Sequence, residues 1–306
     1  PLAVLAASSL DVTDEERLAE QVSRVVAEHG FAGAPMRVIM PRASVEAAAL
    51  DMPAMPQRDL LNAARLELLR EAEHPPLLSL CISPRSTPGG VVVYHMVQQE
   101  RDAVLKALER HALQVAALVP AGDIPALALD AVVTGEQGTL WIEADATRLS
   151  LTLLRGDRWA LERDFAYRLD GERALGEQDL ERISAEVGRT VQFFKQKNRG
   201  IQVSRMLLCG CPDAVRDLLP HLRQTLVMES SIPTWSELGK GLKGPDSWSE
   251  GDGEAFWPFA PSFLLARAWT GKRPIADLLP EEIHEQRNFP RQVAMALVVM
   301  GLLLPL

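Results

Sequence analysis

The stretch from residue 90 to residue 120 constrains the fold most. Residues 90–97 and 113–120 are apolar runs of strand length, and residues 98–112 between them have the spacing of a helix with one apolar face. Two strands joined by a helix of this length are typical of a parallel βαβ unit. The sequence therefore predicts an α/β fold in which mixed sheets pack against helices.

Further elements of the same kind precede this stretch. The first helix is expected to start at a capping box formed by Thr13 and Glu16 and to end at Gly30. Proline-rich residues 52–57 form a turn before the next helix. The remaining elements expected in this half are strands 36–40, 45–50 and 77–82 and a helix over residues 58–72.

The second half begins near Gly135 with three short runs of alternating character, which predict an antiparallel meander. Its strands cover residues 139–144, 148–154 and 159–167. The elements expected after it are helices 177–197, 212–224 and 259–269, strands 205–209 and 225–229, and a polar loop over residues 239–256. We therefore expect two lobes, residues 1–134 and 135–270.

Charge and cysteine content narrow the classes of function. The 306 residues carry a formal net charge of −9, which disfavours nucleic-acid binding because an acidic chain repels phosphates. Three cysteines cannot all pair, so a reducing compartment is expected. The spacing of a metal site is absent from Cys209-Gly-Cys211 and from the six histidines. The spacing of a P-loop is absent from the GKGLKG stretch at residues 239–244.

The last residues form an apolar run, residues 293–306, preceded by Arg287 and Arg291. A membrane span needs about 20 residues, so we interpret the run as the start of a transmembrane helix, with a buried or interfacial helix as the alternative. The basic residues before it would keep the N-terminal domain in the cytoplasm. Residues 271–292 would then form a juxtamembrane segment.

Five stretches, taken in order, resemble the PilM protein of type IV pilus assembly and its type II secretion relative GspL. They are residues 50–75, 97–120, 141–165, 179–198 and 203–222. Residues 272–292 resemble the INLLP start of PilN, ahead of its membrane helix. The resemblance implies a PilM–PilN-type fusion with a two-lobed, actin-like (RNase H-like) fold, whose opening phosphate-binding hairpin is missing before Pro1.

Active members of this fold bind ATP, and the resemblance places the corresponding residues here. In WIEADATRLS, aligned from Thr147, Trp141 stands where the family has a metal-managing Asp and Glu143 where it has Gly. In CGCP, Gly210 is the one glycine left. Trp cannot ligate a metal, and a carboxylate repels phosphates. We expect no bound ATP, no metal and no enzymatic activity; the alternative reads Glu143 or Asp145 as a relocated metal ligand.

The resemblance implies a non-enzymatic cytoplasmic scaffold on the bacterial inner membrane, a single-pass protein that binds neighbouring proteins of a pilus or secretion machine. The alternative is an ATP-binding switch of the same machinery. Formation of a homodimer is a further alternative. Asp277, Leu278, Leu279 and Pro280 match the PilN motif. Because two leucines before a proline favour an extended peptide, we expect them to dock in an apolar groove of this chain or of a second copy. The alternative is a disordered linker.

Overall fold

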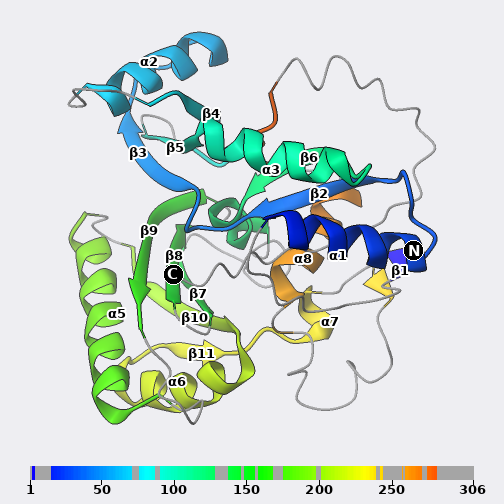
Figure 1. Cartoon of the computed structure of the whole chain (residues 1–306). Helices are drawn as coiled ribbons and strands as arrows, with labels where there is room; N and C mark the ends of the chain where they lie inside the picture. Colours follow the sequence, from blue (N-terminus) through cyan, green and yellow to red (C-terminus); the bar gives the residue numbers. More distant parts are fainter. Residues whose placement is uncertain are drawn as a thin grey trace. The chain divides into compact units, whose positions relative to one another are not determined.

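The computed structural model describes residues 2–3, 15–70, 76–86, 90–127, 137–145, 148–155, 158–167, 175–197, 201–238, 242–243, 257, 259–270 and 274–280. The chain divides into two compact units (Figure 1). Unit 1 comprises Pro1–Val4 and Ile124–Gly271, and unit 2 comprises Leu5–Asp123 and Lys272–Leu306. The chain thus leaves unit 2 after Asp123 and returns to it at Lys272. The expected lobe boundary at residues 134 and 135 falls outside the described residues.

A parallel strand pair forms the centre of unit 2. Strand β2 (Pro35–Met40) pairs with β6 (Gln114–Pro120), and residue Val38 lies opposite Leu118. Helix α1 (Glu15–Glu28) contacts α3 (Gln98–Arg110), and α3 contacts β6 (Figure 1). Val22, Val38 and Leu118 have no exposed surface, so the apolar faces of the strands and helices meet in one core.

The predicted βαβ unit is wrong in its pairing, although its three elements are present. Strand β5 (Gly90–Val97) lies between β3 (Glu46–Asp51) and β4 (Leu78–Ile82) in an antiparallel sheet of three strands. Both edges of β5 are therefore occupied, and α3 leads the chain to a different sheet, where β6 joins β2. Helix α2 (Gln57–Leu69) contacts β4 and buries Ala64 against Val93.

Unit 1 contains a mixed sheet of five strands in the order β11-β10-β7-β8-β9. The predicted meander is confirmed as β7 (Gly138–Ala144), β8 (Arg148–Arg155) and β9 (Arg158–Ala166), which pair antiparallel. Strand β10 (Val203–Gly210) runs parallel to β7 on one side and to β11 (Glu229–Ser231) on the other. Helices α5 (Glu177–Lys197) and α6 (Pro212–Thr225) contact each other.

One predicted strand of unit 1 is displaced. Residues 225–229 were expected to be a strand, but α6 extends through Thr225, whose hydroxyl donates to the His221 carbonyl at 2.9 Å. The Leu226 N–H also bonds the Leu222 carbonyl, so β11 starts only at Glu229. The other elements are β1 (Leu2–Ala3), the short helix η1 (Ala121–Asp123), α7 (Trp235–Leu238), β12 (Leu242–Lys243) and α8 (Ala260–Thr270).

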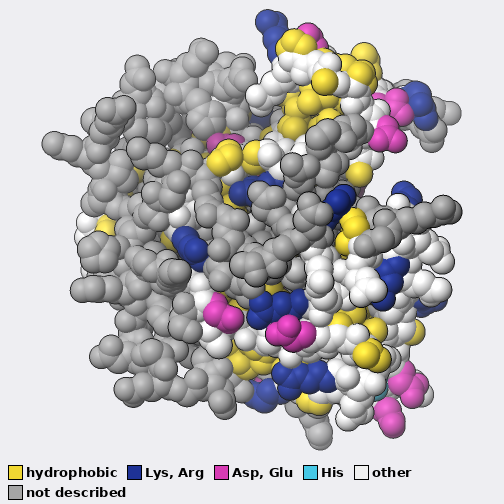
Figure 2. Space-filling model, turned by 180° about the vertical axis from the view of Figure 1, so that it is seen from behind, with side chains coloured by type: hydrophobic (Ala, Val, Ile, Leu, Met, Phe, Trp, Pro, Cys, Tyr) yellow, Lys and Arg dark blue, Asp and Glu magenta, His cyan; other side chains and the backbone are white. Residues whose placement is uncertain are grey.

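The proposed membrane span at residues 293–306 lies outside the described residues, as does the capping residue Thr13. In the described part of the chain, every helix is too short or too polar to cross a bilayer. Basic, acidic and apolar side chains are interspersed among the described residues on the face that Figure 2 shows.

Candidate functional site

The returning chain of unit 2 lies against the free edge of β6. We call residues 274–280 the tail segment. The Leu278 N–H donates to the Leu118 carbonyl oxygen at 2.9 Å, and the Leu118 N–H donates to the Asp277 carboxylate at the same distance. In a parallel pair, alternate residues direct both backbone groups to one side. Leu118 directs both of its groups to the tail segment, which thus covers the edge opposite β2.

Asp277 replaces a backbone acceptor with its side chain. The same Oδ1 that accepts from Leu118 also accepts from the Leu279 N–H at 2.9 Å. A short carboxylate that bonds the backbone two residues ahead holds the chain in a local turn. The two bonds therefore fix the register of the tail segment on β6 and bend the segment immediately after Asp277.

Both leucines that follow Asp277 are buried. Leu278 is 2% exposed and Leu279 is 6% exposed, while Pro280 is half-buried. The segment predicted to dock thus lies with its leucine side chains buried and its backbone bonded to β6 of its own chain. Burying one leucine is worth about 1.5 to 3 kcal/mol, so the two leucines contribute substantially to holding the segment, beside its hydrogen bonds.

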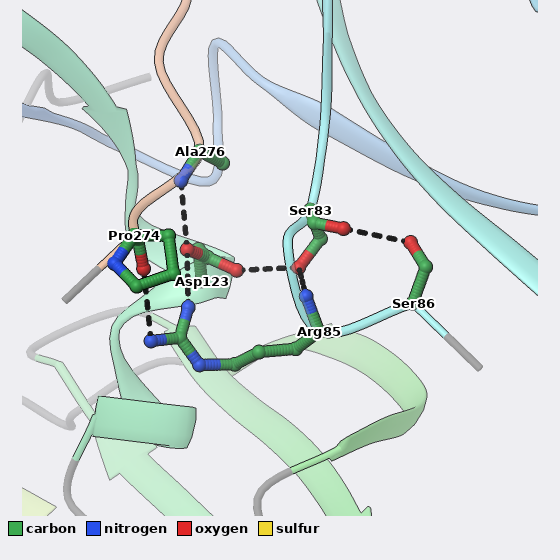
Figure 3. Close-up of polar contacts among 6 residues, drawn as sticks. All are labelled: Ser83, Arg85, Ser86, Asp123, Pro274 and Ala276. Carbon is green, nitrogen blue, oxygen red and sulfur yellow. Dashed lines mark hydrogen bonds and ion pairs between the residues drawn. The ribbon is translucent and has the colours of Figure 1, made fainter. Parts of the chain in front are cut away.

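A buried carboxylate holds the beginning of the tail segment. Asp123, 1% exposed at the end of η1, accepts from the Ser83 hydroxyl at 2.7 Å, from Nη1 of Arg85 at 3.0 Å and from the Ala276 N–H at 3.0 Å (Figure 3). Nη2 of Arg85 donates to the Pro274 carbonyl at 3.2 Å. The Arg85 side chain is itself 10% exposed. We call Ser83, Arg85 and Asp123 the Asp123 cluster.

The loop that carries Ser83 and Arg85 is braced by its own hydroxyl groups. The Arg85 N–H donates to Ser83 Oγ, and Ser86 Oγ donates to the Ser83 carbonyl at 2.8 Å (Figure 3). The Val92 N–H of β5 then donates to Ser86 Oγ at 3.0 Å. These bonds fix the loop to the β4–β5 pair, so that Arg85 is aimed at Asp123 and at the tail.

Charges around the tail segment perturb neighbouring groups. Burial lowers the pKa of Arg37, on β2, to about 10, while the Asp277 carboxylate acts in the opposite direction. Burial raises the pKa of the Cys81 thiol, and the charges of Asp123 and Asp277 raise it further, against a hydrogen bond with the Asp277 backbone. Cys81, 7% exposed on β4, therefore lies beside the docked tail.

The residues expected at a nucleotide cleft lie in unit 1. Trp141 has no exposed surface, and its Nε1 donates to Oε1 of Glu143 at 3.0 Å. Glu143 is half-buried. A carboxylate that accepts from a buried indole and carries a charge is poorly suited to lie beside phosphate. Thr147 lies outside the described residues.

Gly210 is required by the sheet. It has φ +121°, and a Cβ there would overlap the backbone atoms of Ala144 on β7. The next N–H, that of Cys211, donates to the Ala144 carbonyl at 2.6 Å. The close approach that demands a glycine is thus made by β7 itself, and L side chains rarely adopt this conformation.

The cysteines and acids do not gather into a ligand set in the described ranges. Among those residues, no group of three or more His, Cys, Asp or Glu side chains could hold a metal ion. Cys209 is buried in β10 and directs its thiol to the Ile142 carbonyl at 3.7 Å, while Cys211 is half-buried.

The sequence reasoning missed the Asp123 cluster. No role was predicted for Ser83, Arg85 or Asp123. Two serines and an arginine close together in a short loop between strands were the available signal. Nothing local marks Asp123 as buried, because its partners lie 38 to 153 positions away.

A chain of the "PilM-PilN type IV pilus biogenesis complex" superposes with a TM-score of 0.64 over 86% of this chain and 87% of that chain, at 20% sequence identity. This chain has a PilM-like, actin-like fold. The actin-like architecture implied by the sequence resemblance is thereby confirmed.

Two further solved structures are more distantly similar to this chain. A Bacteroides thetaiotaomicron protein of actin-like ATPase fold has a TM-score of 0.46 at 9% identity, covering 75% of this chain and 80% of that one. The cytoplasmic domain of EpsL, from the type II secretion system of Vibrio cholerae, has a TM-score of 0.45 at 14% identity, covering 87% and 84%. No protein-family model and no curated protein sequence matches the chain.

Proposed function

We propose that the protein is a non-enzymatic scaffold of a pilus-assembly or type II secretion platform at the bacterial inner membrane. Its PilM-like fold supports this role, because the similar structure is that of a PilM–PilN assembly. Residues 274–280 supply the PilN-like segment from within the same chain. The folded units would bind neighbouring proteins of the machine, and the C-terminal apolar run would hold them at the membrane.

The bond between Trp141 and Glu143 is the observation that carries the non-enzymatic part of the proposal. Nε1 of a fully buried indole donates to Glu143 at 3.0 Å, on β7, where the sequence resemblance implies the phosphate-contacting and metal-contacting residues. Moving Glu143 toward a metal would leave the indole N–H without this acceptor in the core, which costs about 1 to 3 kcal/mol. An ATP-binding switch is the second candidate, supported by the fold alone.

Calorimetric titration with Mg-ATP tests the proposal. We expect no binding heat at millimolar Mg-ATP and no shift in the melting temperature beyond that produced by Mg²⁺ alone. A ligand that binds the folded state stabilises it by mass action. Micromolar affinity, or a shift of several degrees that Mg²⁺ alone does not reproduce, would establish the switch in place of the scaffold.

A further inference from the structure

The chain's departure from unit 2 and its return to unit 2 both lie near one carboxylate, that of Asp123. Asp123 is the last residue of unit 2 before the chain enters unit 1, and Pro274 and Ala276 lie close behind its return at Lys272. The Ala276 N–H bonds Asp123 directly, and Arg85 joins Asp123 to the Pro274 carbonyl. The Asp123 cluster thus binds the backbone of the first residues of the tail segment.

The tail segment is recognised in two different ways. The Asp123 cluster bonds two backbone groups of the tail segment, the Pro274 carbonyl and the Ala276 N–H, while the burial of Ala276, 1% exposed, limits that position to a small side chain. The residues that follow determine which sequence can bind. The Asp277 carboxylate accepts from the Leu118 N–H, and the two leucines after it are buried. A ligand for this site therefore needs an extended backbone followed by Asp-Leu-Leu, which a second copy of this chain supplies in identical form.

Opening the cluster would change what the edge of β6 can bind. The Asp123 carboxylate is 1% exposed, and without Arg85 it would be a buried charge that must regain water. Water entering here reaches the first anchored residue of the tail. If the tail leaves, the Leu118 N–H and carbonyl become a free strand edge, which is a template for pairing with another chain.

We propose that Arg85 and Asp123 form a clasp that keeps the tail segment bound to its own chain, and that opening the clasp frees the edge of β6 for the tail segment of a second copy. This inference does not depend on whether unit 1 binds ATP. A negative result in the experiment below would therefore leave the proposed scaffold role untouched, and a positive nucleotide titration would leave the clasp untouched.

The test compares Arg85→Met with Arg101→Met in the full chain, in nonionic detergent. Arg101 is a matched control because its side chain is 12% exposed and pairs with Asp102, its neighbour on α3, at 2.7 Å. Release of the tail is followed by the alkylation rate of Cys81, assigned by mass spectrometry, and by amide exchange at Leu118 and Leu278. We expect Arg85→Met to raise all three about ten- to a hundredfold, and Arg101→Met to leave them unchanged.

The second part of the proposal is read from the oligomeric state. Arg85→Met should form a concentration-dependent dimer, and adding Leu278→Ser and Leu279→Ser should abolish it. A synthetic peptide of residues 272–281 should compete with dimer formation and restore the protection of Cys81. An Arg85→Met protein that keeps Cys81 protected, or that releases its tail yet stays monomeric, would overturn the proposal. So would a rise in exchange shared equally by the α3 amides, because that would mean unfolding of unit 2.

Discussion

The Asp277 carboxylate accepts a hydrogen bond from the Leu118 N–H at 2.9 Å, across 159 positions of sequence. The contact closes unit 2 by joining the last described segment of the chain to the strand that precedes its departure into unit 1. A side chain takes the place that a strand's carbonyl would occupy, so residue type at position 277 sets how the segment binds.

Replacing Asp277 separates hydrogen bonding from charge. Asp277→Ala leaves the Leu118 N–H without this acceptor, and we expect a loss of about 1 to 3 kcal/mol in the free energy of unfolding. Asp277→Asn keeps an acceptor at the same place and should lose less than half as much. Urea unfolding of the two variants checks the order. Equal losses would show that the negative charge near Arg37, rather than the acceptor, holds the segment.

Removing the two tail leucines should destabilise unit 2. We expect Leu278→Ser combined with Leu279→Ser to cost about 3 kcal/mol or more, because each buried leucine is worth about 1.5 to 3 kcal/mol. Leu66→Ser is the control, since Leu66 is 75% exposed on α2 and should change stability by less than about 0.5 kcal/mol. Unchanged melting and fast amide exchange through residues 274–280 would mean that the segment is a linker.

Two glycines of unit 1 should respond oppositely to alanine. Gly210→Ala places a Cβ onto the Ala144 backbone at a positive φ, and we expect a loss of at least about 2 kcal/mol. Gly188→Ala lies in α5, where the nearest atom is 3.9 Å from the new Cβ, and should gain about 0.5 to 1 kcal/mol. Thermal unfolding of both variants provides the measurement. An unchanged melting temperature for Gly210→Ala would contradict the close approach of β10 to the Ala144 backbone of β7.

The Cys81 thiol should make stability fall at alkaline pH. Its pKa in the folded protein lies well above the ordinary value of 9.0. The thiol therefore favours folding fully below about pH 9, and this contribution is lost as pH rises, because the unfolded state releases the proton first. The free energy of wild type relative to Cys81→Ala should fall by up to about 1.4 kcal/mol per pH unit above pH 9. Parallel curves for the two proteins would contradict the burial of this thiol beside two carboxylates.

The predicted membrane attachment depends on residues 293–306. We expect the protein to fractionate with membranes, and a chain ended at Pro290 to be released in soluble form. A reporter fused to the native protein beyond the span should report the periplasm, because Arg287 and Arg291 favour the cytoplasmic side. A cytoplasmic reporter signal would instead indicate a helix buried in the protein.

Local patterns predicted individual elements, and they failed where the outcome depends on distant residues. Alternation of apolar residues predicted the meander β7–β9, and helical spacing predicted α5, because side-chain periodicity is a property of neighbours in sequence. The partners of β5 and β6 depend on which edges the other strands leave open. The burial of Asp123 depends on Ser83 and Ala276, and neither position carries a local mark of that contact.

The docking of Leu278 on Leu118 also has a consequence for synthesis. A chain emerging from the ribosome completes residues 5–123 first, yet the edge of β6 stays open until the whole of unit 1 has been made and residue 278 has left the exit tunnel. Contacts this distant in sequence form late. The nascent N-terminal half must therefore carry an exposed strand edge through most of translation, and chaperone dependence should concentrate in that interval.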